Sequence, residues 1–93
     1  MNPEPLRPPE AKKLIHHILK RGNVTYSQPH ALERMKERNL TNVDCVNILR
    51  AGVVQEAEEV KGSWRYQVYT PKMCAVVRFE SESELEIVTA WRT

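Results

Sequence analysis

The spacing of hydrophobic residues changes once along this chain, near residue 53. Before that point apolar residues recur every three or four positions, which is the period of a helix. After it, apolar and polar residues alternate, which is the period of a strand. The 93 residues are enough for one domain with one modest core. The pattern therefore predicts helices in the first half and strands in the second, an α+β fold.

Three helices are predicted in the first half. The first is indicated by apolar residues at helical spacing: Ala11, Leu14, Ile15, Ile18 and Leu19. It ends at Gly22. The second helix follows Pro29, because proline fits the first turn of a helix, and ends at Asn39. The third helix begins after Thr41, a good N-cap, and ends at Gly52. Its Cys45 is expected to be a small core residue.

The remaining segments complete the predicted architecture. Residues 1–10 hold four of the six prolines and are predicted to form an extended arm, so the folded domain is expected over residues 11–93. Residues 23–26 are predicted to be a short extended segment. Four strands are expected at 53–60, 63–70, 73–79 and 85–92. Their connecting turns are short enough for hairpins, so the sheet should be four-stranded and mainly antiparallel, with the helices on one face.

Alternation along the strands separates two faces. One is mostly apolar and is the expected core: Trp64, Tyr66, Val68, Met73, Ala75, Val77, Phe79, Leu85, Ile87, Thr89 and Trp91. The other carries three arginines, an amide and a phenol: Arg65, Gln67, Tyr69, Arg78 and Arg92. Guanidinium groups bind phosphate through paired hydrogen bonds, and amides and phenols contact bases or sugar hydroxyls. The alternative is an ordinary solvated face on which Glu56, Glu58 and Glu86 pair with the arginines.

The second predicted helix carries a positive stripe. His30, Arg34 and Arg38 are four residues apart and share one side, where neighbouring like charges repel by about 0.2–0.5 kcal/mol. A bound anion would remove that repulsion. In the alternative, Glu33 and Glu37 neutralise the arginines locally. The other side of this helix is apolar and is expected to face the core: Ala31, Leu32 and Met35.

Composition narrows the class of protein. Fourteen Lys and Arg against twelve Asp and Glu give a net charge of only +2, so a role with nucleic acid requires the charges to be segregated. The chain shows neither an apolar run of membrane-spanning length nor a signal-peptide pattern, and we expect a cytoplasmic protein. Cys45 and Cys74 lack the Cys-x-x-Cys spacing of zinc sites, and we expect no metal, cofactor or disulfide.

RNA is the anion for which these residues suggest a chemistry. Cleavage through the 2′-hydroxyl needs a base, an acid and cations that stabilise charge on phosphorus. Arginine is too basic to take up the proton, whereas histidine titrates near neutral pH. His30 is the histidine beside the arginine stripe, so it is the candidate proton shuttle, with Tyr69 in reserve.

Several motifs resemble a known family. They are His-Ala-x-Glu-Arg-Met-x-Glu-Arg in the second helix, Ala-Gly after the third, and a closing Ile-Val-Thr-Ala-Trp-Arg. Together they resemble small domains encoded beside zinc-ribbon antitoxins, and the MqsR and BrnT branches of the RelE-like toxin superfamily. Trp64-Arg-Tyr-Gln-Val-Tyr-Thr-Pro71 resembles a Trp-Gln-x-Val-Tyr-x-Pro stretch of MqsR. The resemblance covers roughly residues 11–93.

The resemblance implies a RelE-like fold and a toxin of a type II toxin–antitoxin pair that acts as a metal-independent messenger-RNA endoribonuclease. Its partners would be messenger RNA, free or on the ribosome, and a cognate antitoxin. Gln67 matches a functional glutamine of MqsR when one inserted residue is allowed, and Arg92 matches a basic residue on the last strand. The position of the catalytic tyrosine of MqsR falls near Cys74 or Val76 here, so that tyrosine is missing, and so is the lysine after the last helix.

The predicted site combines both lines of reasoning. The predicted catalytic residues are His30, Arg65, Gln67, Tyr69 and Arg92, and the predicted RNA-binding residues are Arg34, Arg38 and Arg78. Two other functions stay open on the sequence alone. One is a catalytically inactive RNA- or protein-binding module on the same scaffold. The other is an assembly protein whose arginine face meets an acidic partner. The sequence carries no signal for the oligomeric state.

Overall fold

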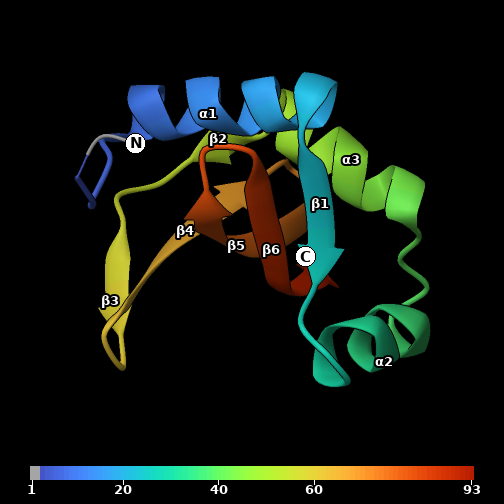
Figure 1. The fold of residues 1–93 in the computed structure, drawn as a ribbon. Coiled ribbons are helices and arrows are strands. Elements are labelled where there is room, and N and C mark those ends of the chain that lie inside the picture. The colour runs from blue at the N-terminus through green and yellow to red at the C-terminus, as the bar shows by residue number, and fades with distance from the viewer. Residues whose placement is uncertain (1–2) are drawn as a thin grey trace.

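The structure, a computed structural model, describes residues 3–93, which form three helices and a mixed sheet of six strands (Figure 1). The helices are α1 (Pro8–Arg21), α2 (His30–Glu37) and α3 (Asn42–Ala51). The strands are β1 (Asn23–Tyr26), β2 (Val53–Val54), β3 (Glu58–Val60), β4 (Ser63–Tyr69), β5 (Met73–Ser81) and β6 (Glu84–Arg92). The predicted α+β class is confirmed.

The sheet differs from the predicted four-stranded meander in two places. Its strand order is β1-β6-β5-β4-β2, and β3 pairs with β4 alone. Strands β4, β5 and β6 are antiparallel neighbours, as predicted, but β1 joins the edge of the sheet parallel to β6. The predicted strand 53–60 is interrupted at residues 55–57, so β3 turns away with β4 as a separate hairpin. Figure 1 shows this hairpin extending beyond the body of the sheet.

Helix α3 begins and ends as the sequence predicts. The hydroxyl of Thr41 accepts a hydrogen bond from the Asp44 amide at 3.2 Å, and the Asp44 carboxylate accepts one from the Thr41 amide at 2.9 Å. Gly52 closes the helix, its amide donating to the Ile48 carbonyl at 2.8 Å. A Cβ on Gly52 would lie 2.7 Å from a methyl carbon of Val68, so the glycine lets α3 pass close to β4.

The predicted extended arm is wrong at residues 8–10, which belong to helix α1, whereas residues 3–7 lie outside any helix or strand. Helix α1 already begins at Pro8, and Leu6 is buried in the core. The Leu6 amide donates to the Tyr66 hydroxyl at 3.0 Å, and that hydroxyl donates to the Glu4 carboxylate at 2.9 Å. Burial raises the pKa of Tyr66 to about 12. Residues 3–7 are therefore held against the sheet. Residues 1–2 lie outside the described part.

One hydrophobic core lies between the helices and one face of the sheet. Cys45 is fully buried in it, which confirms its predicted role, and burial raises the pKa of its thiol to about 11. Ala31 and Met35 of α2 are buried as predicted, but Leu32 is 40% exposed. Helix α2 lies along the edge of the layer against β6, so only a narrow strip of it is covered. Within residues 3–93, every helix is too short or too polar to cross a membrane.

Candidate functional site

The helices leave one face of the sheet uncovered, and we call it the open face. On β4 it carries Arg65, Gln67 and Tyr69, because these residues alternate with the buried Tyr66 and Val68. On β5 and β6 it carries the residues opposite them in the ladder: Cys74, Val76, Arg78, Glu86, Thr89 and Trp91. The predicted grouping of Arg65, Gln67, Tyr69 and Arg78 on one face is therefore confirmed.

A β-bulge in β6 overturns the predicted position of Arg92. Val76 pairs with Thr89, but Val77 pairs with Ile87, so Val88 is an extra residue in the ladder. Beyond the bulge the two faces exchange. Thr89 and Trp91 lie on the open face instead of in the core, and Arg92 moves to the face that the helices cover.

On that covered face, the side chain of Arg92 donates to backbone carbonyls at the end of α2, and the side chain of Arg38 donates to a backbone carbonyl of β6. Arg92 donates from Nη2 to the Asn39 carbonyl at 2.8 Å and from Nε to the Arg38 carbonyl at 3.3 Å. Arg38 donates to the Ala90 carbonyl at 2.7 Å. Arg92 also forms an ion pair with Asp44 at 3.5 Å. These contacts fasten the C-terminal end of α2 to β6, which is a structural role.

The other predicted residues of α2 also lie apart from the open face. His30 and Arg34 are exposed, and the helix packs through Ala31 and Met35 onto the covered side. The prediction that His30 and Arg92 share one groove with Arg65 is therefore wrong. Amphipathic spacing identified the side of α2 that faces the core, but gave no information on which strand the helix contacts.

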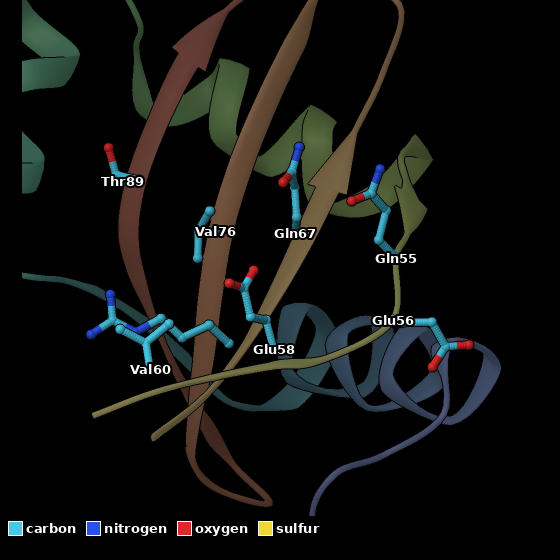
Figure 2. A pocket seen from close by; sticks show the side chains of 8 residues that line it. Gln55, Glu56, Glu58, Val60, Gln67, Val76 and Thr89 are labelled. Atoms are coloured by element: carbon cyan, nitrogen blue, oxygen red, sulfur yellow. The ribbon is translucent and has the colours of Figure 1, made fainter. Parts of the chain in front are cut away.

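A hollow of about 240 Å³ lies on the open face, bounded on one side by the β3–β4 hairpin. We call it the Arg65 hollow. It is lined by polar side chains and a few apolar ones: Gln55, Glu56, Glu58, Val60, Arg65, Gln67, Val76 and Thr89. Figure 2 shows the amides of Gln55 and Gln67 extending in the same direction, with the Glu58 carboxylate nearby. Two of the predicted site residues, Arg65 and Gln67, are brought together here.

Arg65 is the unusual side chain in the hollow. Its Nε atom is buried and has no hydrogen-bond partner within residues 3–93. Glu58 stands directly opposite Arg65 in the β3–β4 ladder, with both side chains on one face, yet the two form no ion pair. A buried donor without a partner costs about 1–3 kcal/mol, and more when it is charged. The Nε donor of Arg65 is therefore unsatisfied by this part of the chain, and the residue lines the hollow.

Arg78 on the same face is already neutralised. Its Nε donates to Glu86 at 2.9 Å, and its Nη2 contacts Glu80. The hydrogen bond that Arg78 donates to Glu86 is the main reason why the pKa of Arg78 is raised. The solvated-face alternative is thus correct for Arg78 and Glu86, but not for Arg65 and Glu58.

Gln67 and Tyr69 continue the open face beyond Arg65. The amide nitrogen of Gln67 donates to the sulfur of Cys74 at 3.7 Å, which orients the side chain. Tyr69 is 37% exposed and stands in one cross-strand row with Cys74 and Trp91. Because strand residues two apart are about 7 Å from each other, Tyr69 lies outside the hollow but next to it. An aromatic side chain there offers a surface on which a base can stack.

Sequence reasoning missed four polar residues of the hollow as site residues: Gln55, Glu56, Glu58 and Thr89. The two glutamates were considered only as partners that neutralise arginines. Gln55 and Glu56 lie in the interruption between β2 and β3, and Thr89 follows the bulge. Strict alternation gives no signal for either irregularity.

No protein-family model matches this chain, and no curated protein or solved structure is significantly similar to it. Within residues 3–93, no group of three or more His, Cys, Asp and Glu side chains is arranged to hold a metal ion.

Proposed function

We propose that this protein is a metal-independent endoribonuclease that cleaves messenger RNA in the Arg65 hollow. The observation that carries the proposal is that the buried Nε of Arg65 has no hydrogen-bond partner within residues 3–93. The carboxylate of Glu58 and the amide of Gln67 line the same hollow. A cation, a base and a hydrogen-bonding amide are the side chains that transesterification at a phosphodiester uses.

Each residue takes a defined role in this reaction. The Glu58 carboxylate accepts the proton of the 2′-hydroxyl, whose oxygen then attacks phosphorus. The Arg65 guanidinium donates to the phosphoryl oxygens as negative charge builds on them. Gln67, held by its contact with Cys74, hydrogen-bonds the substrate and orients it. The bond from phosphorus to the 5′-oxygen breaks, that oxygen takes a proton from water, and a 2′,3′-cyclic phosphate remains.

A direct assay tests this assignment. Purified protein is incubated with RNA in EDTA, and the ends of the products are analysed. We expect 2′,3′-cyclic phosphate ends from the wild type and none from Arg65→Gln. Arg50→Gln is the matched control, because Arg50 is exposed on α3, on the covered side of the sheet. Equal cleavage by wild type and Arg65→Gln, on RNA alone and on ribosomes, would show that the hollow is not the active site.

The cellular role proposed with this activity is that of a toxin with a RelE-like fold, held inactive by a cognate antitoxin in the cytoplasm. The support for it is the motif resemblance together with the uncovered sheet face, on which an inhibitor can lie. Expression of the wild type should arrest growth, and Arg65→Gln should relieve the arrest. Growth arrest that is undiminished in Arg65→Gln would separate toxicity from the hollow.

A second candidate function has its own observation. No histidine lines the hollow, since His16 and His17 belong to α1 and His30 to α2. A positioned general acid contributes about 10²–10⁴-fold to such reactions, so its absence favours slow cleavage or binding alone. In the binding-only case the protein holds RNA with a steep salt dependence and cuts no strand. Flat salt dependence would instead indicate a protein partner.

A further inference from the structure

The charges of this protein are segregated between its two layers. Residues 1–52, which include all three helices, contain nine Lys and Arg and five Asp and Glu, a net charge of +4. Residues 53–93, which form β2 to β6, contain five Lys and Arg and seven Asp and Glu, a net charge of −2. The overall +2 therefore hides a positive helical layer, and the positive pole lies away from the open face.

Helix α1 carries most of this excess. Its solvent side presents four basic residues, all exposed, which we call the basic stripe: Lys13, His17, Lys20 and Arg21. Lys12 and His16 turn towards the C-terminal end of α3 instead. Lys12 donates to the Gly52 carbonyl at 2.6 Å, and Nε2 of His16 lies 2.9 Å from the Arg50 carbonyl oxygen. The stripe thus consists of the side chains that α1 does not use for its own packing.

Nothing within α1 neutralises the stripe. Glu10 is its single acidic residue, in the first turn, and no carboxylate follows in the helix. Lys13, Lys20 and Arg21 form no hydrogen bond or ion pair through their side chains within residues 3–93. The last-turn cations are favoured by the helix dipole, but Lys13 is too far from the C-terminus to benefit.

Helix α2 shows the contrasting arrangement. Its cations stand three residues from Glu33 or Glu37, a spacing at which opposite charges lie on neighbouring positions of a helix. Helix α2 thus carries acidic residues among its cations, whereas the part of α1 that carries the basic stripe contains none. Outside the helix, Glu82 faces His17, and the lysines and Arg21 are exposed. An exposed row of cations is the electrostatic footprint of a polyanion-binding surface.

We infer that the basic stripe of α1 is a docking surface for the sugar–phosphate backbone of RNA. The stripe from Lys13 to Arg21 is about 12 Å long at 1.5 Å per residue. A segment of that length can lie along several consecutive phosphates of one RNA strand. A membrane is a poorer partner, because the apolar side of α1 is buried in the core and cannot insert into lipid. The inference rests on the proposed function in that RNA is the polyanion.

The position of the stripe defines what the RNA must look like. Helix α1 covers one face of the sheet, and the Arg65 hollow lies on the other. One short strand lying in the hollow does not reach the stripe as well. The RNA that uses both surfaces must therefore be large or structured, with a helical segment against α1 and a single-stranded segment on the open face.

Fluorescence anisotropy with a labelled 2′-O-methyl RNA hairpin tests the inference. This probe lacks the 2′-hydroxyl, so binding is measured without cleavage. The triple variant Lys13→Gln/Lys20→Gln/Arg21→Gln should bind at least about 10-fold more weakly, and its plot of log affinity against log salt should be shallower by about 2–3. The matched control Lys36→Gln/Lys61→Gln/Lys72→Gln removes the same charge from other exposed positions and should keep most of the slope.

Three results would overturn the inference. The first is a slope of log affinity against log salt that is the same for the two triple variants, and the second is a slope in the α1 variant equal to that of the wild type. The third is an α1 variant that still binds RNA but no longer binds phosphatidylserine vesicles. Circular dichroism confirms that both variants are folded. A weakened α1 variant with no cleavage by the wild type would refute the proposed reaction but support the docking surface. Cleavage that depends on Arg65, together with RNA binding that is unchanged in the α1 variant, would support the proposed reaction but refute the docking surface.

Discussion

Arg65 and Tyr66 are consecutive residues of β4 that point to opposite faces of the sheet, and their polar groups differ in one respect. On the covered face, the Tyr66 hydroxyl accepts from the Leu6 amide and donates to Glu4, so it is fully used by the protein. On the open face, the buried Nε of Arg65 has no partner within residues 3–93. Buried polar groups in folded proteins are almost always hydrogen-bonded, so Arg65 is an exception, and the proposed function assigns its guanidinium to a ligand.

The arginines show the same difference. Arg38, Arg78 and Arg92 donate to carbonyls or carboxylates of this chain. In the sequence these arginines look equivalent to Arg65, since all four occupy regular positions of helices or strands. What separates them is whether the folded chain supplies an acceptor, and that depends on tertiary contacts.

The largest effect is expected from Glu58→Gln. Loss of the carboxylate that faces Arg65 removes the proposed base, so cleavage should fall about 10²–10⁴-fold in the assay for cyclic phosphate ends. Glu59→Gln is the matched control, because Glu59 pairs with Trp64 and does not line the hollow. If both variants cleave as the wild type does, Glu58 is not the base.

Tyr66→Phe examines the covered face. The Leu6 amide loses its acceptor, so the free energy of unfolding near neutral pH should fall by about 1–3 kcal/mol, measured by urea denaturation. Tyr69→Phe is the control, because Tyr69 is 37% exposed and its hydroxyl has no partner within residues 3–93. Equal stability of both variants would show that the Tyr66 hydrogen bonds contribute nothing.

The pKa of Tyr66 also predicts how stability depends on pH. It is raised from 10.0 to about 12, chiefly by burial, so the folded state favours the neutral phenol. Its contribution to stability is present below pH 10 and is lost as the pH rises through about 12. The wild type should therefore lose more stability than Tyr66→Phe over this interval. A loss of equal size in both would contradict the prediction.

Arg38→Gln tests the contacts between α2 and β6. It removes a donor to the Ala90 carbonyl at 2.7 Å, and we expect a loss of about 1 kcal/mol, read as a lower thermal midpoint. Arg34→Gln, four residues earlier and exposed, should change the midpoint little. A larger loss in Arg34→Gln than in Arg38→Gln would refute the structural role of Arg38.

The smallest effect is expected from His30→Ala. His30 is exposed on α2, on the covered side of the sheet, so cleavage should stay within about 2-fold of the wild type and stability within about 0.5 kcal/mol. A hundredfold loss of cleavage would instead restore His30 as the proton shuttle and contradict the position of the site.

The sequence predicts the helices well because their ends carry local chemistry. Thr41 and Gly52 mark α3, and a capping box and a close backbone approach explain both. The α+β class follows from the change of period near residue 53. The parallel pairing of β1 with β6 could not be predicted, because four extended residues carry no information about a partner more than fifty residues away.

The sequence predicts some residues of the candidate site correctly and others wrongly. Arg65 and Gln67 follow from strict alternation on β4, which is a regular strand. Arg92 does not, because one extra residue, Val88, reverses the two faces of β6. The sequence identifies Glu58 only as a carboxylate that could pair with an arginine. That the two form no ion pair is set by their side-chain conformations in the folded chain, which no local pattern specifies.

Comparison of Arg65→Gln with Arg92→Gln tests the central claim most directly. Cleavage of RNA in EDTA and the thermal midpoint are measured for both variants. We predict that Arg65→Gln loses cleavage by at least about 10²-fold and keeps its midpoint, because its guanidinium serves the ligand. Arg92→Gln should keep cleavage and lose about 1 kcal/mol of stability, because its guanidinium serves the fold. The opposite pattern, with cleavage lost in Arg92→Gln and kept in Arg65→Gln, would contradict this account.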